Sequence, residues 1–245
     1  MAVVAVIGGS GFYDFPELEN QKTISVETPY GVVDEILQGN WNQTSVLFLP
    51  RHGGKHRTPP HKVNYQANIA ALSQMGATKV IAFNATGGIG ASFGPDTLVV
   101  PDQIIDYSYG RAHTFFEGED ERLSHIDFTH PFDEKMRQQL LESLRYIGAS
   151  FYDGGTYGCT QGPRLESAAE IKKLQNDGCD LVGMTLMPEA ALAREKDLAY
   201  VSLSLIVNWC AGVRDEVISL DKIMARLESS VPKIREVILK MISLG

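Results

Sequence analysis

Short apolar segments alternate with helix-like segments along the whole chain, and this alternation limits the possible folds more than any other feature. The apolar segments are rich in Val and Ile, and several are apolar at successive positions, which is typical of strands buried on both faces. They are AVVAVIG (2–8), TSVLFLP (44–50), KVIAFNA (79–85), TLVVPDQIID (97–106), DLVGMT (180–185) and YVSLSLIVN (200–208).

Helix patterns lie between and after these segments. They are KVNYQANIAALSQMG (62–76), FDEKMRQQLLESLRYIG (132–148), SAAEIKKLQNDG (167–178) and SLDKIMARLESSVPKIREVILKMIS (219–243), and a further helix is expected to begin near Pro188. The first three end on glycine, a common helix stop. The alternation predicts an α/β fold of three layers, with a mixed, largely parallel sheet between helices. With 245 residues and no break in composition, one domain over 1–245 is expected.

The composition excludes several classes of protein. A net charge of −8 without a basic cluster argues against a nucleic-acid partner. No apolar run approaches the length of a membrane span, and the N-terminus lacks the features of a signal peptide, so a cytoplasmic protein without a membrane partner is expected. None of the three cysteines lies in a C-x-x-C pair, so neither a disulfide framework nor a zinc site is indicated.

Polar residues follow four of the predicted strands. In α/β sheets, ligands bind beyond the carboxyl ends of the strands, where such residues converge. Hydroxyl groups, the guanidinium fork and backbone N–H groups suit a tetrahedral oxyanion, and phosphate is the simplest choice. The candidates are Ser10 in IGGSGFYD, Arg51 and His52 in LPRHGGKH, the backbone of Asn84 and Ala85 in FNATGG, and Thr185 in GMTLMPE.

Three of these four strand ends also have an alternative explanation. The glycines around Ser10 and after Asn84 are explained equally well by tight turns, and Thr185 could be only a local helix cap. The first glycine cluster is not a dinucleotide fingerprint, because Asp14 occupies the position of the third glycine in G-x-G-x-x-G. A dinucleotide-dependent oxidoreductase is therefore disfavoured.

The combination of IGGSGF, VNYQANI, NATGG, QGPRLES and MTLMPE resembles the trimeric purine nucleoside phosphorylases, a family that includes methylthioadenosine phosphorylase. The resemblance covers almost the whole chain. It implies a homotrimeric pentosyltransferase that uses a purine nucleoside and phosphate and requires no metal or organic cofactor. It also implies that Ser10, Arg51, His52, Asn84, Ala85 and Thr185 bind phosphate and that Met184 lies under the ribose.

The base-binding positions depart from the adenine-specific members of this family. Those members end the last strand with Asp-x-Asp, whereas this chain has Asn208 and Cys210. An Asn amide offers a donor and an acceptor, so Asn208 suits a 6-oxopurine and is the expected catalytic residue at the leaving base. Glu166 resembles the family's acceptor for purine N1–H, and Leu165 replaces an aromatic residue beside the base. An exposed carboxylate at a helix start is the alternative for Glu166.

Three further positions concern the sugar. Leu220 is the nearest match to the position where ordinary family members place a His over the 5′-hydroxyl and where methylthio-type members are apolar. Leu220 and Ile223 would then pack a methylthio group. The alternative is that both form the buried face of the C-terminal helix. His125 lies where family members lend a residue to the neighbouring subunit's sugar pocket, although a simple surface His is an equal alternative.

Together these residues predict phosphorolysis of S-methyl-5′-thioinosine to hypoxanthine and S-methyl-5-thio-α-D-ribose 1-phosphate, a reaction of purine and methylthio salvage. Three alternatives remain open. The chain could be a methylthioadenosine phosphorylase with an atypical base pocket, a general 6-oxopurine nucleoside phosphorylase, or a non-catalytic nucleoside-binding module. A non-catalytic binding module needs no phosphate subsite, so Arg51, His52 and Thr185 argue against it.

Overall fold

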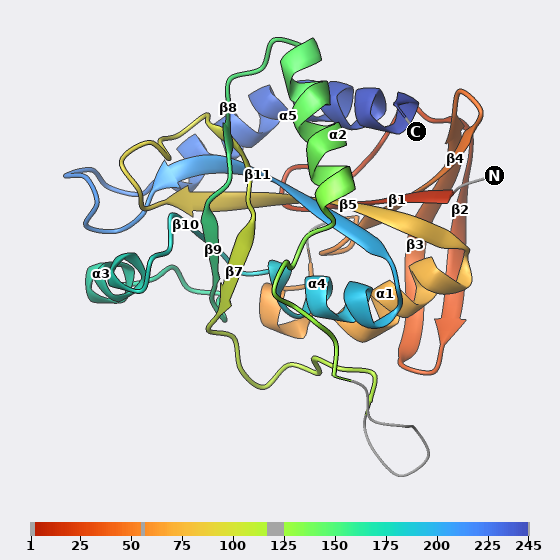
Figure 1. Ribbon diagram of the computed structural model, residues 1–245, viewed down its shortest axis with the longest axis horizontal. Helices are drawn as coiled ribbons and strands as arrows, with labels where there is room; N and C mark the ends of the chain where they lie inside the picture. Colours follow the sequence, from red (N-terminus) through yellow and green to blue (C-terminus); the bar gives the residue numbers. More distant parts are fainter. Residues whose placement is uncertain (1–2, 55–56, 117–124, 245) are drawn as a thin grey trace.

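A mixed sheet of eleven strands forms the centre of the computed structural model, which describes residues 3–54, 57–116 and 125–244 (Figure 1). Along the main path the strand order is β2 (Glu19–Thr28), β3 (Gly31–Trp41), β4 (Thr44–Pro50), β1 (Val3–Gly8), β5 (Ala77–Gly88), β10 (Leu181–Gly183), β9 (Thr156–Cys159) and β7 (Gln103–Asp106). Off this path, β11 (Ala199–Trp209) pairs with β5 and β6 (Leu98–Val100), and β6 pairs with β8 (Phe151–Asp153).

Helices cover both faces of this sheet. The helices α1 (Tyr65–Gln74) and α4 (Leu186–Glu195) contact each other on one face, and α2 (Glu134–Tyr146) and α5 (Leu220–Ser243) contact each other on the opposite face (Figure 1). The short helix α3 (Ala168–Asn176) lies to one side, near β9 and β10. The predicted α/β fold, with helices on both faces of a mixed sheet, is confirmed.

The central strands are apolar at successive positions because each face packs against a different helical layer. In β1, Ala5 and Ile7 belong to the core cluster shared with α1 and α4, whereas Val4 and Val6 belong to the cluster shared with α2 and α5. Burying both sets stabilises the fold at roughly 25 cal/mol per Å² of apolar surface.

The helix boundaries follow from local sequence signals. Gly76, Gly148 and Gly178 follow the first three helices and adopt φ values of 82°, 65° and 93°, a left-handed region that glycine enters without a steric penalty. Ser167 begins α3 in a reciprocal capping box with Glu170. The predicted glycine stops are therefore confirmed.

The structure also differs from the predicted elements. The segment 97–106 forms two strands, β6 and β7, because Pro101 has no backbone N–H and the two strands pair with different partners. The hairpin of β2 and β3 was not predicted, nor were β8 and β9. Most residues of β2 are exposed and polar, so it lacks the apolar pattern that marks the central strands.

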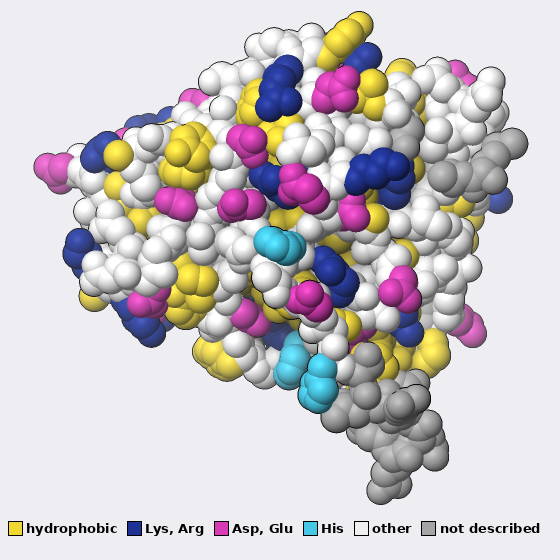
Figure 2. Space-filling model, viewed as in Figure 1, with side chains coloured by type: hydrophobic (Ala, Val, Ile, Leu, Met, Phe, Trp, Pro, Cys, Tyr) yellow, Lys and Arg dark blue, Asp and Glu magenta, His cyan; other side chains and the backbone are white. Residues whose placement is uncertain are grey.

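Among the described residues, no helix is long and apolar enough to cross a membrane. On the face drawn in Figure 2, Lys and Arg side chains are interspersed with Asp and Glu side chains rather than gathered into one basic patch.

A break in strand pairing along β5 positions the functional pocket. One edge of β5 pairs with β1 as far as Ala82 and then with β10 from Gly87 onward, while the opposite edge pairs with β11. On the first edge, no described strand pairs with residues 83–86. The sheet therefore opens at the carboxyl ends of β1, β4 and β5, the region where α/β proteins bind ligands.

Candidate active site

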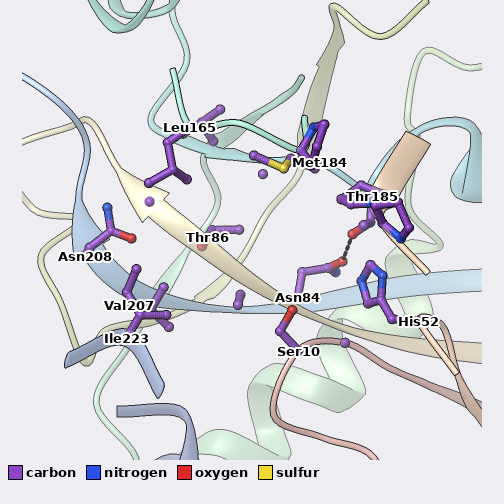
Figure 3. A pocket seen from close by; sticks show the side chains of 18 of the residues that line it. Ser10, His52, Asn84, Thr86, Leu165, Met184, Thr185, Val207, Asn208 and Ile223 are labelled. Carbon is purple, nitrogen blue, oxygen red and sulfur yellow. Dashed lines mark hydrogen bonds between the residues drawn. The ribbon is translucent and has the colours of Figure 1, made fainter. Parts of the chain in front are cut away.

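A cavity of about 570 Å³ lies at this opening in the sheet. All of the predicted site residues except His125 line it, namely Ser10, Arg51, His52, Asn84, Ala85, Leu165, Glu166, Met184, Thr185, Asn208, Cys210, Leu220 and Ile223. His125 is exposed and is not among the lining residues. Figure 3 shows Ser10, His52, Asn84 and Thr185 at one end, and Asn208 and Leu165 at the other. We call these the strand-end pole and the base-side pole.

Ser10 is presented to the strand-end pole by a tight turn. The turn is closed by a hydrogen bond of 3.0 Å from the Phe12 N–H to the Gly9 carbonyl oxygen. A Cβ atom at Gly9 would lie 2.6 Å from the Phe83 carbonyl oxygen, so only glycine lets the turn approach β5 this closely. The turn explanation and the ligand explanation for these glycines are therefore compatible.

Arg51 is fixed by an ion pair that the sequence did not reveal. Its Nε and Nη2 donate to the Glu189 carboxylate at 2.5 and 2.7 Å, and its Nη1 donates to the Phe83 carbonyl oxygen at 3.0 Å. The Tyr200 hydroxyl also donates to Glu189, at 2.7 Å. Burial lowers the pKa of Arg51, but the charge of Glu189 and its hydrogen bonds to Arg51 together outweigh this effect, so the pKa is raised and Arg51 stays cationic. The one signal for Glu189 was an acid within the apolar sequence LMPEAALA.

The protonation of His52 is constrained by its backbone partner. Nδ1 lies 2.8 Å from the Thr58 carbonyl oxygen, and because a carbonyl only accepts, Nδ1 must carry the proton. In the neutral ring, Nε2 is then an acceptor, so it can donate to an oxyanion only in the imidazolium form. Arg57 and Thr58, neither of them predicted, also line this end of the pocket.

Asn84 and Thr185 form a hydrogen-bonded chain behind the strand-end pole. The Thr185 hydroxyl donates to Asn84 Oδ1 at 2.7 Å, and Asn84 Nδ2 donates to the Ser202 hydroxyl at 2.8 Å (Figure 3). The Asn84 side chain is therefore used as support, and the role of its backbone toward a ligand stays a prediction. Thr185 makes no side-chain capping bond to α4, so the cap alternative is wrong.

At the base-side pole, the Asn208 amide has a defined orientation. Its Nδ2 donates to the Trp209 carbonyl oxygen at 2.7 Å, and Figure 3 shows Oδ1 turned toward the other pocket residues. In this orientation the amide offers the pocket an acceptor, and one N–H of Nδ2 is already used. The structure thus favours the acceptor role of Asn208 over its donor role.

Glu166 lies at the same pole and does not cap a helix. Its Oε1 accepts a hydrogen bond of 2.6 Å from the Thr160 hydroxyl, a partner that was not predicted. Helix α3 begins after Ser167, and Ser167 and Glu170 satisfy its first turn. The alternative of a helix-start carboxylate therefore belongs to Glu170, and Glu166 remains a wall of the pocket.

Cys210 contributes a small neutral surface beside Glu166. Burial, reinforced by the charge of Glu166, raises the pKa of the Cys210 thiol, so the group is protonated at neutral pH. A Cβ atom at Gly87 would lie 2.5 Å from Cys210 Sγ, so this glycine leaves the room that the thiol occupies. Leu165 is 45% exposed and lies at the mouth of the pocket.

The remaining wall is apolar. Met184 lies between the two poles, and Val207 and Ile223 lie together opposite it (Figure 3). Ile223 also packs against the core cluster below, so its packing explanation is confirmed, and its contact with a ligand stays a prediction. Leu220 is 71% exposed, which shows that the buried-face alternative is wrong for this residue.

The described residues include no group of three or more His, Cys, Asp or Glu side chains placed to hold a metal ion. The base-side pole offers the acceptors Asn208 Oδ1 and Glu166, and both poles open into the same cavity.

The family model described as the phosphorylase superfamily matches residues 3–243. The chain belongs to this superfamily. The predicted family membership is confirmed.

Relatives of this phosphorylase superfamily chain include the probable S-methyl-5′-thioinosine phosphorylase of Xanthomonas campestris pv. campestris. The two are 48% identical over 237 residues, which cover 96% of this chain and 95% of that protein. The 6-oxopurine nucleoside phosphorylase of Pyrococcus furiosus is 41% identical over 249 residues, covering 100% and 93%.

The fold of this superfamily member is also similar to a solved structure, the methylthioadenosine phosphorylase from Schistosoma mansoni in complex with adenine. The TM-score is 0.94 at 30% sequence identity, with 100% of this chain and 91% of that chain covered. The arrangement of the sheet and helices is therefore that of the nucleoside phosphorylases.

Proposed function

We propose that this chain catalyses phosphorolysis of S-methyl-5′-thioinosine, giving hypoxanthine and S-methyl-5-thio-α-D-ribose 1-phosphate. One observation carries the proposal. A single cavity joins a pole that suits an oxyanion, an apolar wall, and a pole that presents the acceptors Asn208 Oδ1 and Glu166. The relatives named S-methyl-5′-thioinosine and 6-oxopurine nucleoside phosphorylases support it.

The strand-end pole would hold phosphate against C1′ of the nucleoside. A phosphate oxygen forms the new bond to C1′ while the bond from C1′ to purine N9 breaks and its electron pair moves into the base. The transition state carries positive charge on the sugar, which the phosphate anion stabilises. The reaction so proposed needs inorganic phosphate as a co-substrate and no metal or organic cofactor.

The base-side pole would favour a 6-oxopurine. Hypoxanthine carries N1–H, from which the Glu166 carboxylate can accept a hydrogen bond. As the C1′–N9 bond breaks, the base would take up a proton from solvent at N7, and Asn208 Oδ1 can accept a hydrogen bond from that N7–H. Adenine has no hydrogen at N1, so the same carboxylate would face a second acceptor. Such a mismatch typically costs about 1–3 kcal/mol.

The apolar wall would receive the 5′ substituent. Ile223 and Val207 offer carbon surface and no polar side-chain atom, which suits a methylthio group better than a hydroxyl. However, the exposure of Leu220 leaves this side of the pocket open. That observation favours the second candidate function, a general 6-oxopurine nucleoside phosphorylase.

Initial rates of base release, measured with and without phosphate, test these alternatives. We expect phosphate-dependent cleavage with kcat/KM highest for S-methyl-5′-thioinosine. Faster cleavage of S-methyl-5′-thioadenosine would contradict the base argument, and equal cleavage of inosine would contradict the 5′ argument. Absence of phosphate-dependent release from every nucleoside would indicate a non-catalytic binding module.

We also propose that the chain forms a cytoplasmic homotrimer in which His125 contributes to the sugar pocket of a neighbouring subunit. His125 is exposed and outside its own subunit's pocket, so it is available to a neighbour. All three cysteines are free, which suits a reducing compartment. Sedimentation equilibrium should give three times the chain mass, and a monomer would contradict the proposal.

A further inference from the structure

The Glu166 carboxylate is held by one neighbouring side chain, Thr160. The Thr160 hydroxyl lies 2.6 Å from Oε1, a short distance typical of a hydroxyl donating to a carboxylate. The same hydroxyl lies 3.4 Å from the Gly183 carbonyl oxygen, and because a hydroxyl has one hydrogen, the shorter contact receives it. Within the described part of the chain, Glu166 has no other hydrogen-bond partner, and Oε2 remains as an acceptor.

The backbone of Thr160 is held in place by its neighbours. It follows the last residue of β9, and its backbone N–H donates to the Gly183 carbonyl oxygen at 2.8 Å. Its own carbonyl oxygen accepts from the Arg111 guanidinium at 3.1 Å. Because the Thr160 side chain is short, this fixed backbone also determines the position of its hydroxyl.

Arg111 extends this fixation to the ribose side of the pocket. Arg111 is 9% exposed, and its guanidinium also donates to the carbonyl oxygens of Gln161 and Met184, at 3.0 and 2.9 Å. The segment that carries Thr160 and the segment that carries Met184 are thus tied to one buried cation. Because Glu166 accepts a hydrogen bond from Thr160, its carboxylate is held in a fixed position relative to Met184, the residue predicted to lie under the ribose.

We propose that Thr160 is a positioning residue that sets the base specificity of the pocket. Its hydroxyl occupies Oε1 of Glu166 and leaves Oε2 as the acceptor for a purine N–H donor. A carboxylate held in one orientation discriminates between a donor and an acceptor on the base, whereas a freely rotating carboxylate can turn away from an acceptor. This inference rests on the proposed function, because it requires Glu166 to face purine N1.

The test compares S-methyl-5′-thioinosine with S-methyl-5′-thioadenosine, which share the sugar and differ only in the base. The measured quantity is the ratio of their kcat/KM values. We expect Thr160→Val to lower this ratio about tenfold, the effect of losing one hydrogen bond to a charged group. Thr160→Ser keeps the hydroxyl and should restore the ratio to within about twofold of wild type.

Thr114 provides a matched control. Its hydroxyl donates to Glu195 Oε1 at 2.8 Å, a bond of the same kind that lies outside the pocket. Thr114→Val should leave the ratio unchanged. A merely structural role for Thr160 would lower both kcat/KM values equally, so an unchanged ratio in Thr160→Val would overturn the proposal, as would a Thr160→Ser ratio as low as that of Thr160→Val.

Two further measurements keep the test interpretable. Thermal unfolding followed by circular dichroism establishes that each variant is folded, and Thr160→Ala replaces Thr160→Val if the valine variant is not. Failure of the proposed function appears separately, as the absence of phosphate-dependent hypoxanthine release in the wild-type protein. An altered ratio in Thr160→Val, by contrast, requires an active wild type.

Discussion

The Arg51 guanidinium donates to both carboxylate oxygens of Glu189, at 2.5 and 2.7 Å, although the two residues are 138 positions apart. Both side chains are buried, with 0% and 1% of their surface exposed. The pair therefore joins the end of β4 to α4 beneath the strand-end pole, and it holds the cation of that pole in one position.

Removing one partner of this pair should destabilise the fold strongly. Glu189→Ala leaves a buried guanidinium without its counter-charge, which typically costs about 3–5 kcal/mol. The free energy of unfolding in urea measures the loss. Arg164→Ala is the control, since it breaks the exposed pair of Arg164 with Glu170 and should cost much less. Equal losses in the two variants would show that burial of the Arg51 pair has no energetic consequence.

Exchanging the amide of Asn208 should change the preferred base. Asn208→Asp adds a carboxylate that can accept from a 6-amino group and repels O6 of a 6-oxopurine. We expect kcat/KM to rise for S-methyl-5′-thioadenosine and to fall about tenfold or more for S-methyl-5′-thioinosine, consistent with one mismatched hydrogen bond. Steady-state assays on both nucleosides decide the matter, and an unchanged preference would remove Asn208 from base recognition.

The sequence predicted the central strands of the fold, because their apolar composition reflects burial on both faces. The strands β1, β4, β5 and β11 are apolar at successive positions because helices cover both of their faces, and this pattern is visible without a structure. The β2 and β3 hairpin lies at one end of the sheet, and β2 is largely exposed. Its polar composition resembles that of a loop, so periodicity did not identify it.

The sequence likewise predicted some residues of the candidate site and missed others. Residues at strand ends, such as Ser10 and Thr185, were predicted because strand ends converge in any parallel sheet. Glu189 and Thr160 act through another side chain, and their partners lie 138 and six positions away. Such pairings depend on how the elements pack, so no spacing in the sequence reveals them. The resemblance to a family predicted residues that line the pocket, but not the residues that hold them.

A polar substitution in the apolar wall should lower activity more where the replaced side chain is more buried. Ile223 is half-buried against the core, so Ile223→Ser should lower kcat/KM for S-methyl-5′-thioinosine about tenfold, the effect of losing roughly 1.5 kcal/mol of apolar contact. Leu220→Ser changes a residue that is 71% exposed and should have a smaller effect. Inosine, which has a 5′-hydroxyl, should be affected less than the methylthio substrate in both variants. A larger effect at Leu220 than at Ile223 would indicate that the pocket closes over the ligand.

The free energy of unfolding should fall in alkaline solution because the Cys159 thiol is buried. Burial raises the pKa of Cys159 to about 12, so the folded state keeps a proton that the unfolded state releases above about pH 8.5. The associated stability is present below pH 8.5 and is lost as the pH rises toward 12, by about 1.4 kcal/mol per pH unit. Urea unfolding between pH 7 and 10 should therefore show a shallower decline in Cys159→Ala than in wild type. Identical slopes would mean that this thiol does not titrate differently in the two states.

Arg57 should contribute attraction for phosphate without contributing to the fold. It lines the strand-end pole next to His52 and is exposed, whereas the charge of Arg51 is already paired with Glu189. Arg57→Gln should raise the KM for phosphate several-fold and weaken its dependence on ionic strength, because a solvent-exposed charge acts through a field that salt screens within about 8–10 Å. The control is Lys172→Gln, which removes an exposed cation from α3 that does not line this pocket. Phosphate titrations at two salt concentrations make the comparison, and an equal salt dependence in wild type and Arg57→Gln would exclude this role.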